Sequence, residues 1–197
     1  MTMTTNRQIA AGAEATIERS DDRVIKRRVV KNYRIPELDT RIRASRTRNE
    51  AKLISEARRC GVPTPIIYDV DTAEHTITME FIEGPRLKEV LDLRLSEEIG
   101  ELVGRLHSCG IIHGDLTTSN LIKNDDRICF IDFGLGYFEK SMEAQGVDVH
   151  VLFQTFVSTH NDSGLEEAFS HGYKRTFADA DQVLARVREI EARGRYL

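Results

Sequence analysis

The sequence predicts an α+β protein of two lobes, and three observations support this fold class. The front part shows short strand patterns around one long helical pattern, whereas the back part is mostly helical, an order typical of α+β folds. A break at Gly84-Pro85 separates the parts and predicts a hinge. The length of 197 residues suits a single domain, so we expect a small β-rich lobe at 1–83 and a reduced helical lobe at 84–197.

Strands and one long helix account for the front part. Residues 37–59 carry apolar side chains at helical spacing and predict a long helix, which Gly61 and Pro63 end. The turn residues Ser20-Asp21-Asp22 separate two strands. The predicted strands cover residues 7–10, 14–19, 23–29, 66–70 and 76–82.

The back part is predicted to be helical around one central loop. Apolar residues recur at helical spacing from Leu95 to Leu106. Ser96 favours a helix start and Gly110 a helix end. A loop, a strand, a tight turn and two or three further helices follow at residues 113–120, 127–132, 134 and 147–192.

Composition indicates a globular chain, with 40% apolar and 30% charged residues. No apolar run approaches the roughly 18 residues of a membrane span, and the N-terminus has no apolar signal segment. We therefore expect a cytoplasmic protein without membrane contact. The three cysteines, Cys60, Cys109 and Cys129, lack metal-binding spacing and are predicted to be reduced, partly buried thiols.

Charge is distributed unevenly along the chain. Residues 1–60 hold 15 Lys and Arg against 8 Asp and Glu, a net +7, whereas residues 61–197 hold 13 against 24, a net −11. The basic front part suggests a polyanionic partner such as RNA, or an acidic protein surface. Its arginine cluster is either a solvated helix face or a basic patch for a partner or tRNA, and comprises Arg41, Arg43, Arg46 and Arg48.

The segments HGDLTTSN, residues 113–120, and IDFG, residues 131–134, carry the chemistry. Together they match the H-x-D-L-x-x-x-N and D-F-G spacing of the protein-kinase signature, although each motif alone is a weak signal. Phosphoryl transfer needs metal ions and positioned cations, because negative charge spreads over the moving group. Asp132 is predicted to bind Mg²⁺, Asn120 to hold a second metal ion, and Asp115 to orient or deprotonate the attacking hydroxyl or water.

The front part supplies the other half of a nucleotide site. Lys26 ends an apolar–apolar–Lys strand pattern and is predicted to contact the α and β phosphates of ATP. Glu50 on the long helix is its predicted ion-pair partner, with Glu56 as the alternative on the same helix. A phosphate-binding loop should precede this strand, and its candidates are Gly12, Ala13, Glu14 and Ala15, where one glycine and small residues let the backbone approach phosphate.

Apolar residues around the predicted hinge indicate an adenine site. Met79 takes the position that borders such a pocket, and backbone groups of Glu80 and Ile82 are predicted to bond the adenine edge. Three further side chains are predicted to sandwich the adenine faces, namely Ile9, Val24 and Ile122. The same residues also suit an ordinary apolar core, and the two interpretations are compatible.

Nearly the whole chain resembles one family beyond this signature. It looks like the small atypical Ser/Thr kinase subunit of the KEOPS (EKC) complex, a PRPK-type kinase related to the RIO kinases. The pieces that carry the resemblance are GAEA (12–15), KNYRIPELD (31–39), RTRNEAKLI (46–54), GVPTP (61–65), HGDLTTSN (113–120), IDFGLG (131–136), VDVHVL (147–152) and ARGRYL (192–197).

The resemblance implies a minimal bilobal protein-kinase-like fold and an ATP- and Mg²⁺-dependent kinase that autophosphorylates or hydrolyses ATP. It implies membership of the complex that makes N6-threonylcarbamoyladenosine in tRNA. The implied partners are the threonylcarbamoyl-transferring subunit and a small helical subunit at the front lobe. The tail residues Arg193 and Arg195 either reach toward that partner or tRNA, or form a frayed terminus. Asp148 is expected to bond the backbone of the 113–115 turn, unless it is a helix-surface residue.

Two departures from ordinary kinases keep other functions open. Thr117 stands where typical Ser/Thr kinases carry a lysine that steadies the γ-phosphate, and only 13 residues, Leu135 to Val147, separate Gly134 from Asp148. Both departures count against efficient phosphorylation of protein substrates. The alternatives are a small-molecule phosphotransferase of the aminoglycoside-kinase type and a scaffold that binds nucleotide but scarcely turns it over.

Overall fold

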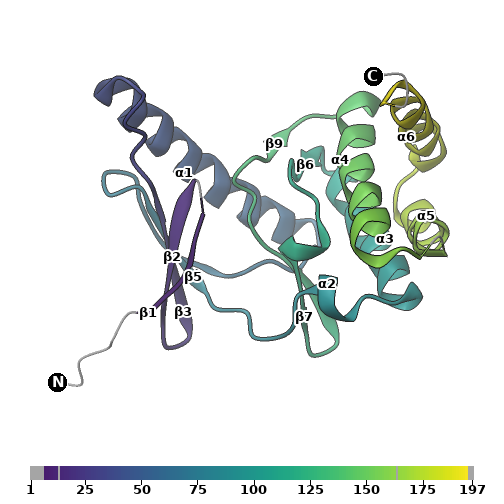
Figure 1. Ribbon diagram of the computed structural model, residues 1–197, viewed down its shortest axis with the longest axis horizontal. Coiled ribbons are helices and arrows are strands. Elements are labelled where there is room, and N and C mark those ends of the chain that lie inside the picture. Colours follow the sequence, from purple (N-terminus) through teal and green to yellow (C-terminus); the bar gives the residue numbers. More distant parts are fainter. Residues whose placement is uncertain (1–6, 13, 163, 195–197) are drawn as a thin grey trace.

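The computed structural model describes residues 7–12, 14–162 and 164–194, with the backbone alone for 7–11 and 194. Figure 1 shows two lobes: a sheet with the long helix α1 (Pro36–Arg59) forms the N-lobe, and the remaining helices gather in the C-lobe. The predicted α+β class and the order of the elements are thus confirmed. No helix in the described part of the chain is long and apolar enough to cross a membrane.

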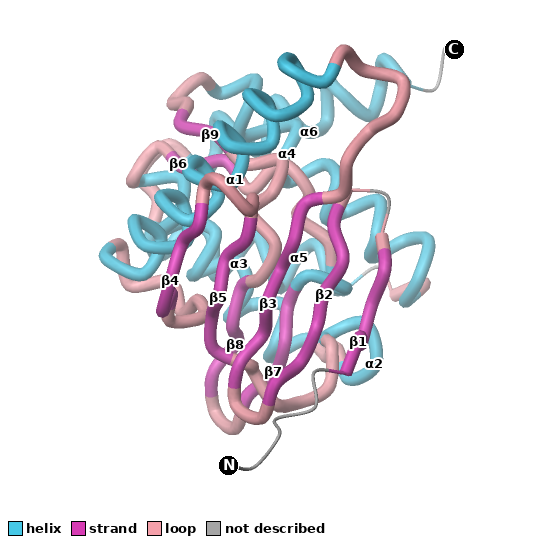
Figure 2. The backbone as a smooth tube through the Cα atoms, turned by 90° about the vertical axis from the view of Figure 1, so that its left-hand side faces the viewer, coloured by secondary structure: helices cyan, strands magenta, loops and turns pink. Residues whose placement is uncertain are grey.

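The N-lobe sheet is antiparallel and has the strand order β1-β2-β3-β5-β4 (Figure 2). Its strands are β1 (Arg7–Ala11), β2 (Ala15–Ser20), β3 (Arg23–Arg28), β4 (Ile67–Asp71) and β5 (Thr76–Glu80). Residue Lys26 of β3 faces Ile17 of β2, and Arg28 faces Ala15. Because side chains alternate along a strand, Lys26 and Arg28 lie on one face of the sheet. Both are buried, whereas Arg27 between them is exposed.

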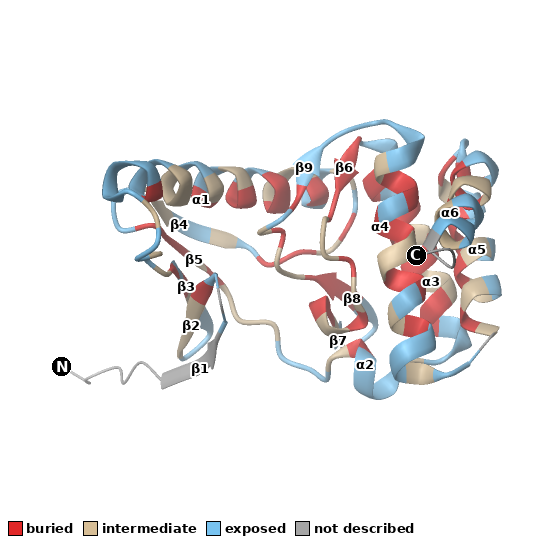
Figure 3. Ribbon diagram, turned by 45° about the horizontal axis from the view of Figure 1, so that its top comes forward, coloured by how far each residue is buried: buried red, intermediate tan, exposed pale blue. Residues whose placement is uncertain are grey.

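Helix α1 has residue types that favour a helix at both of its ends and apolar residues on its buried side. Pro36 stands in the first turn, acidic residues follow it, and basic residues occupy the last turn, all of which favour the helix. Its buried residues lie along one side (Figure 3) and include Leu53, Ile54 and Ala57 near its C-terminal end. That end packs into the main apolar core, so α1 connects the sheet to the C-lobe.

The C-lobe is a helical group with two short strand pairings. Its helices are α2 (Leu87–Val90), α3 (Leu93–Ser108), α4 (Met142–Thr155), α5 (Gly164–Thr176) and α6 (Ala180–Gly194), with a 3₁₀ turn at Thr118–Asn120 and a π-helical turn at Phe156–His160. Its strands are β6 (Ile111–Ile112), β7 (Leu121–Asn124), β8 (Arg127–Phe130) and β9 (Tyr137–Phe138). Strand β6 pairs with β9, and β7 pairs with β8.

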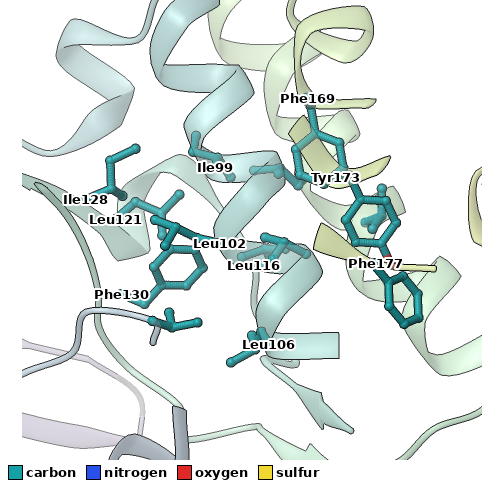
Figure 4. Close-up of a cluster of buried hydrophobic side chains, with 14 of the residues drawn as sticks. Ile99, Leu102, Leu106, Leu116, Leu121, Ile128, Phe130, Phe169, Tyr173 and Phe177 are labelled. Carbon is teal, nitrogen blue, oxygen red and sulfur yellow. The ribbon is translucent and has the colours of Figure 1, made fainter. Parts of the chain in front are cut away.

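Helices α3 and α5 pack closely because glycines face the neighbouring backbone. A Cβ at Gly100 would lie 2.1 Å from the carbonyl oxygen of Phe169, and one at Gly172 would lie 1.9 Å from that of Glu97. Phe169, Tyr173 and Phe177 form a row along this contact (Figure 4), with adjacent ring centroids 5.4 and 5.3 Å apart. This row belongs to the one large apolar core of the C-lobe.

Several predicted boundaries in the C-lobe were wrong. Helix α3 starts at Leu93, because the side chain of Asp92 caps it by accepting the N–H of Leu95 at 2.7 Å. Ser96, the predicted start, is instead buried and donates to the carbonyl of Leu165 at 2.7 Å. Helix α4 begins at Met142 rather than at residue 147, and β7 was not predicted.

The prediction of three reduced cysteines was also wrong. Cys60 and Cys109 form a disulfide, with their Cα atoms 6.5 Å apart and a sequence separation of 49 residues. Each residue caps the C-terminal end of a helix, Cys60 that of α1 and Cys109 that of α3. These two helix ends meet only in the folded chain, so the spacing of the cysteines in the sequence does not predict the disulfide. Cys129 remains a free, buried thiol, and burial raises its pKa to about 12.

Candidate active site

Two adjoining cavities lie between the lobes and share the side chains of Ile17, Lys26 and Asp132. The outer cavity measures about 320 Å³ and is lined by Gly12, Glu14, Ala15, Ile17, Lys26, Arg28, Asp115, Asp132, Gly134 and Leu135. The inner cavity measures about 170 Å³ and is lined by Ile17, Val24, Lys26, Glu50, Pro65, Met79, Glu80, Phe81, Ile82, Arg86, Asn120, Ile122, Ile131 and Asp132. Half of the residues that line the outer cavity are charged, whereas the inner cavity is lined mostly by apolar side chains such as Val24, Met79 and Ile122. This arrangement suits a base at one end and phosphates at the other.

Lys26 stands at the junction of the two cavities and joins three elements. Its Nζ lies 2.6 Å from Glu50 Oε1 on α1 and 2.7 Å from Asp132 Oδ1 after β8. The structure therefore contains the predicted Lys26–Glu50 ion pair, and Glu56 is paired elsewhere, with Arg59 at 2.5 Å. The other carboxylate oxygen of Glu50 accepts a hydrogen bond from Arg28 Nη2.

Electrostatics keep this centre charged. Burial alone would lower the pKa of Lys26, but the nearby carboxylates of Glu50 and Asp132 raise it above its ordinary value. Burial would raise the pKa of Asp132, yet the ammonium of Lys26 and the N–H of Gly134 hold it below its usual range. Asp132 also has a positive φ of 64°, a conformation that costs roughly 1 kcal/mol or more for a non-glycine residue. The surrounding contacts hold the residue in this conformation.

Asp115 and Asn120 are held together in the loop before β7. The Nδ2 of Asn120 donates to the backbone oxygen and to Oδ2 of Asp115, both at 2.9 Å. These bonds aim the amide nitrogen at Asp115 and leave the amide oxygen of Asn120 for a cation. Gly114 is required beside them, because φ is 80° and a Cβ there would lie 2.3 Å from the carbonyl oxygen of Leu135.

Asp148 on α4 anchors the same loop from below. Its carboxylate accepts the backbone N–H of His113 at 2.8 Å and that of Gly114 at 2.9 Å, the contact predicted from the sequence. His107 Nε2 lies 3.3 Å from Asp148 Oδ2, and His107 Nδ1 lies 2.7 Å from the hydroxyl of Tyr173. Burial opposes the charge of Asp148, but these hydrogen-bonding neighbours hold its pKa below the usual range.

Residues 80–82, just before the hinge at Gly84-Pro85, leave few free backbone N–H groups to bond an adenine base. The N–H of Glu80 donates to the carbonyl of Ile66 at 2.8 Å, and that of Phe81 donates to Asp22 at 2.8 Å. Of residues 80–82, Ile82 has the N–H without a backbone acceptor in the described part of the chain, so this N–H can bond an adenine edge next to the wall formed by Met79. This arrangement favours the predicted use of Ile82.

The structure brings most of the predicted site residues to the cavities, but sequence reasoning missed Ile17, Pro65, Ile131, Arg86 and Arg28. Ile17 and Arg28 share the inward faces of β2 and β3 with Ala15 and Lys26, so the period of two along each strand could have identified them. Arg86 donates to the carbonyl of Ser119, a contact that sequence spacing does not announce.

Some predicted residues fall outside the described residues or have other partners. Ala13 and Arg195 lie outside them, as does the side chain of Ile9, whose backbone belongs to β1. Arg193 Nη2 lies 3.1 Å from Glu143 Oε1 on α4, so its tail position is already paired. The tail role in partner binding therefore stays a prediction.

The predicted basic patch on α1 is partly neutralised. Arg43 Nε lies 2.6 Å from Asp39 Oδ2, and Arg46 Nη1 lies 2.8 Å from Glu14 Oε2 at the rim of the outer cavity. The exposed remainder of the patch is Arg41 and Arg48. A polyanion would meet fewer free cations here than the sequence suggests.

The side chains of Asp132 and Asn120 suit a Mg²⁺ site in which phosphate oxygens supply further ligands. Asp132 and Asn120 both line the inner cavity and offer a carboxylate and an amide oxygen, the ligand types that Mg²⁺ prefers. The described residues contain no cluster of three His, Cys, Asp or Glu that could hold a metal ion alone. A metal ion here would therefore need further ligands from a nucleotide or water.

Comparison with known proteins places the chain. A RIO domain family model matches residues 15–166. The chain is 60% identical over 174 residues to the probable bifunctional tRNA threonylcarbamoyladenosine biosynthesis protein of Methanosarcina mazei, and this match covers 88% of the chain but only 31% of that relative. It is 46% identical to the probable serine/threonine-protein kinase BUD32 homolog of Archaeoglobus fulgidus, covering 96% of both.

Two further matches agree. The chain is 43% identical to the KEOPS complex subunit Bud32 of Pyrococcus abyssi, covering 88% of the chain and 84% of that relative. The Rio2 kinase–ADP/Mg²⁺–phosphoaspartate complex from Chaetomium thermophilum has the same fold, with a TM-score of 0.62 at 16% identity over 98% of this chain and 72% of that one. The chain therefore belongs to the RIO domain family and, within it, to the Bud32 proteins.

Proposed function

We propose that this chain is an ATP-dependent atypical Ser/Thr kinase and ATPase, and a subunit of the complex that makes N6-threonylcarbamoyladenosine in tRNA. One observation carries the enzymatic part: Lys26 is far in sequence from Asp115, Asn120 and Asp132, yet the four residues meet around two joined cavities. Their residue types suit phosphoryl transfer, in which positioning and charge stabilisation do most of the work. The names of the matched relatives support the biological part.

The residues divide the work as follows. Adenine would occupy the inner cavity against Met79 and Ile82, and Lys26 would hold the α and β phosphates, oriented by Glu50. Asp132 and Asn120 would hold Mg²⁺, which supplies positive charge to the phosphates. Asp115 would orient the attacking hydroxyl or water and take its proton as the new bond to phosphorus forms and the bond to the leaving oxygen breaks.

The remaining assignments rest on the family. The partners would be the threonylcarbamoyl-transferring subunit, a small helical subunit on the N-lobe, and tRNA, which the arginines of α1 and the tail residues Arg193 and Arg195 would contact. The segment between Gly134 and Met142 is short, so a docking platform for a peptide has little room. We also propose that residues 1–83 and 84–197 act as two lobes of one domain in a cytoplasmic protein.

ATP turnover tests the enzymatic proposal. We expect Asp115→Ala and Asp132→Ala each to lower turnover by roughly 100-fold or more, measured with magnesium, the partner subunit and tRNA present. Asp126→Ala removes an exposed carboxylate in the β7–β8 turn and should leave turnover unchanged. Equal turnover in the wild type and all three variants would remove the catalytic assignment.

Two further assays separate the alternatives. An Asp115→Asn variant that supports tRNA modification as well as the wild type would favour the scaffold role, because a scaffold needs the fold but not the base. Phosphorylation of small hydroxylated acceptors, absent in Asp115→Asn, would favour a small-molecule phosphotransferase. We expect neither outcome.

A further inference from the structure

Arg28 is a second buried cation at the phosphate end of the site. It lies two residues after Lys26 on the same face of β3 and is 5% exposed. Lys26 borders both cavities. Arg28 and Asp115 border the outer cavity but not the inner one. A path from the inner cavity outward therefore passes Lys26 first and reaches Arg28 afterwards.

The position of Arg28 in the sheet supports the same order. Its partner across the strands is Ala15, the last residue of the candidate phosphate loop and the first of β2. Gly12 and Glu14 of that loop also line the outer cavity. Arg28 thus lies at the end of β3 next to the loop, whereas Arg23 at the other end pairs with Glu80 near the hinge.

The side chain of Arg28 has unused hydrogen-bonding capacity. Its Nη2 donates to Glu50 Oε2, and lies 3.4 Å from the carbonyl oxygen of Arg46. Its Nε is buried and finds no acceptor among the described residues. Buried donors normally have a partner, and an unpaired one is unfavourable. An incoming oxygen-rich group would supply the missing acceptor.

Two cationic groups converge on one point beside Asp132. A Cβ built at Gly134 would lie 3.6 Å from Arg28 Nη2 and 3.6 Å from Lys26 Nζ. A guanidinium next to an ammonium suits a phosphate group, since the guanidinium donors that Glu50 and Arg46 do not use can bond phosphate oxygens while the ammonium offers a point charge. Thr117, where typical Ser/Thr kinases carry a lysine, offers no such charge in the loop.

We propose that Arg28 binds the terminal phosphate of the nucleotide, so that the site prefers a triphosphate over a diphosphate. This inference rests on the proposed nucleotide-binding function. Lys26 then holds the inner phosphates, which ATP and ADP share, and Arg28 holds the one that only ATP has. Glu50 orients both cations through its two carboxylate oxygens.

Equilibrium dialysis of ATP and of ADP with MgCl₂ tests this assignment. We expect Arg28→Gln to weaken ATP binding roughly tenfold or more, equivalent to about 1.4 kcal/mol, while ADP binding changes less than threefold. A purely structural role through Glu50 and Lys26 would weaken both nucleotides alike, because both contact Lys26. The ratio of the two dissociation constants therefore reports on Arg28 itself.

The matched control is Arg27→Gln, on the same strand but exposed and paired with Glu74 at 3.2 Å. It should leave both affinities unchanged. If Arg28→Gln does not fold, Arg28→Lys keeps the charge beside Glu50 but loses the planar fork, and it should lower the ATP preference. A wild type that binds ATP, with an unchanged ATP-to-ADP ratio in the folded variant, overturns the inference. A wild type that binds neither nucleotide instead overturns the proposed function.

Discussion

The C-lobe and the N-lobe bury different kinds of side chain. The C-lobe core is continuous and apolar from α3 to α6, with the aromatic row of Phe169, Tyr173 and Phe177 at its centre. The described side chains of the N-lobe form a smaller apolar cluster between α1 and the sheet, built on Ala51, Ile77 and Met79. Beside that cluster lie three buried charged residues, Lys26, Arg28 and Glu50.

This difference indicates how stability and function are divided. An apolar core is stabilised by burial and packing, and its residues need not touch a ligand. Buried charges are costly unless each has a partner, so the N-lobe charges depend on one another. The same charges form the wall of the proposed nucleotide site. The stability of the N-lobe should therefore depend on ligand binding and on substitutions that change charge. The stability of the C-lobe should depend on substitutions that change side-chain volume.

The largest expected effect is a cavity in the C-lobe core. Phe169→Ala removes a fully buried ring that lies against Tyr173 and Phe153, and should lower the free energy of unfolding by about 4 kcal/mol. Denaturant unfolding measures this loss. Val157→Ala, at a position 64% exposed, is the control and should change stability by less than about 0.5 kcal/mol. Equal losses in the two variants would contradict the division between core and surface.

The disulfide should come next, because it joins a helix of each lobe. Closing a loop between residues 49 apart corresponds to about 3 to 4 kcal/mol in the chain-entropy account. Reduction, or a Cys60→Ser and Cys109→Ser double variant, should lower the free energy of unfolding by up to this amount. Cys129→Ser is the matched control for bond counting: thiol titration of the unfolded, unreduced chain should find one free thiol in the wild type and none in Cys129→Ser. Three free thiols in the unreduced wild type would contradict the bond.

The next largest loss of unfolding free energy should come from removing the buried carboxylate of the N-lobe. Glu50→Gln leaves Lys26 and Arg28 buried without their shared carboxylate, and should cost about 3 kcal/mol. Glu56→Gln on the same helix removes only the partner of exposed Arg59, and should cost less than about 1 kcal/mol. Urea unfolding of both variants gives the comparison. A loss as small in Glu50→Gln as in Glu56→Gln would show that the buried charges are not coupled.

The sequence predicted the site residues correctly where they belong to short local motifs or to strong strand and helix patterns. The spacing of HGDLTTSN and IDFG identified Asp115, Asn120 and Asp132, because these residues lie on one short stretch of loop, strand and turn. Lys26 and Glu50 followed from an apolar strand and a long helix, whose patterns are strong. The structure brings these five residues to the two cavities.

It failed where a partner comes from a distant element. The disulfide depends on two helix ends meeting, and the hydrogen bond from Arg86 to the carbonyl of Ser119 joins segments 33 residues apart. The patch on α1 looked free in part because Glu14, the partner of Arg46, lies 32 residues earlier in the chain. The pair of Asp39 and Arg43 is an i,i+4 contact within α1, which the sequence could have indicated. The start of α3 was misplaced because Ser96 has the cap residue type but is used in the core.

Acid should weaken the loop anchor in the C-lobe. The folded-state pKa of Asp148 is below its unfolded value of about 3.9, so its stabilisation is present above that pH and is lost as pH falls through the folded pKa. We expect Asp148→Asn to cost about 2 kcal/mol at pH 7, with the difference from wild type shrinking below about pH 4. Asp181→Asn, whose side chain is 81% exposed, should differ little at any pH. A difference that stays constant down to pH 2 would contradict the assignment.

The smallest effect should come from the ion pair at the cavity rim. The side chains of Arg46 and Glu14 are 36% and 48% exposed, so solvent and salt screen their attraction. A double-mutant cycle with Arg46→Gln and Glu14→Gln should give a coupling energy of about 0.2 to 1 kcal/mol, smaller in 1 M salt than at low salt. The buried pair of Glu50 with Arg28 should show a larger coupling that salt reduces less, since both side chains are shielded from water. Equal salt dependence of the two couplings would mean that the N-lobe charges behave as surface charges, and the contrast between the lobes would then rest on the apolar core alone.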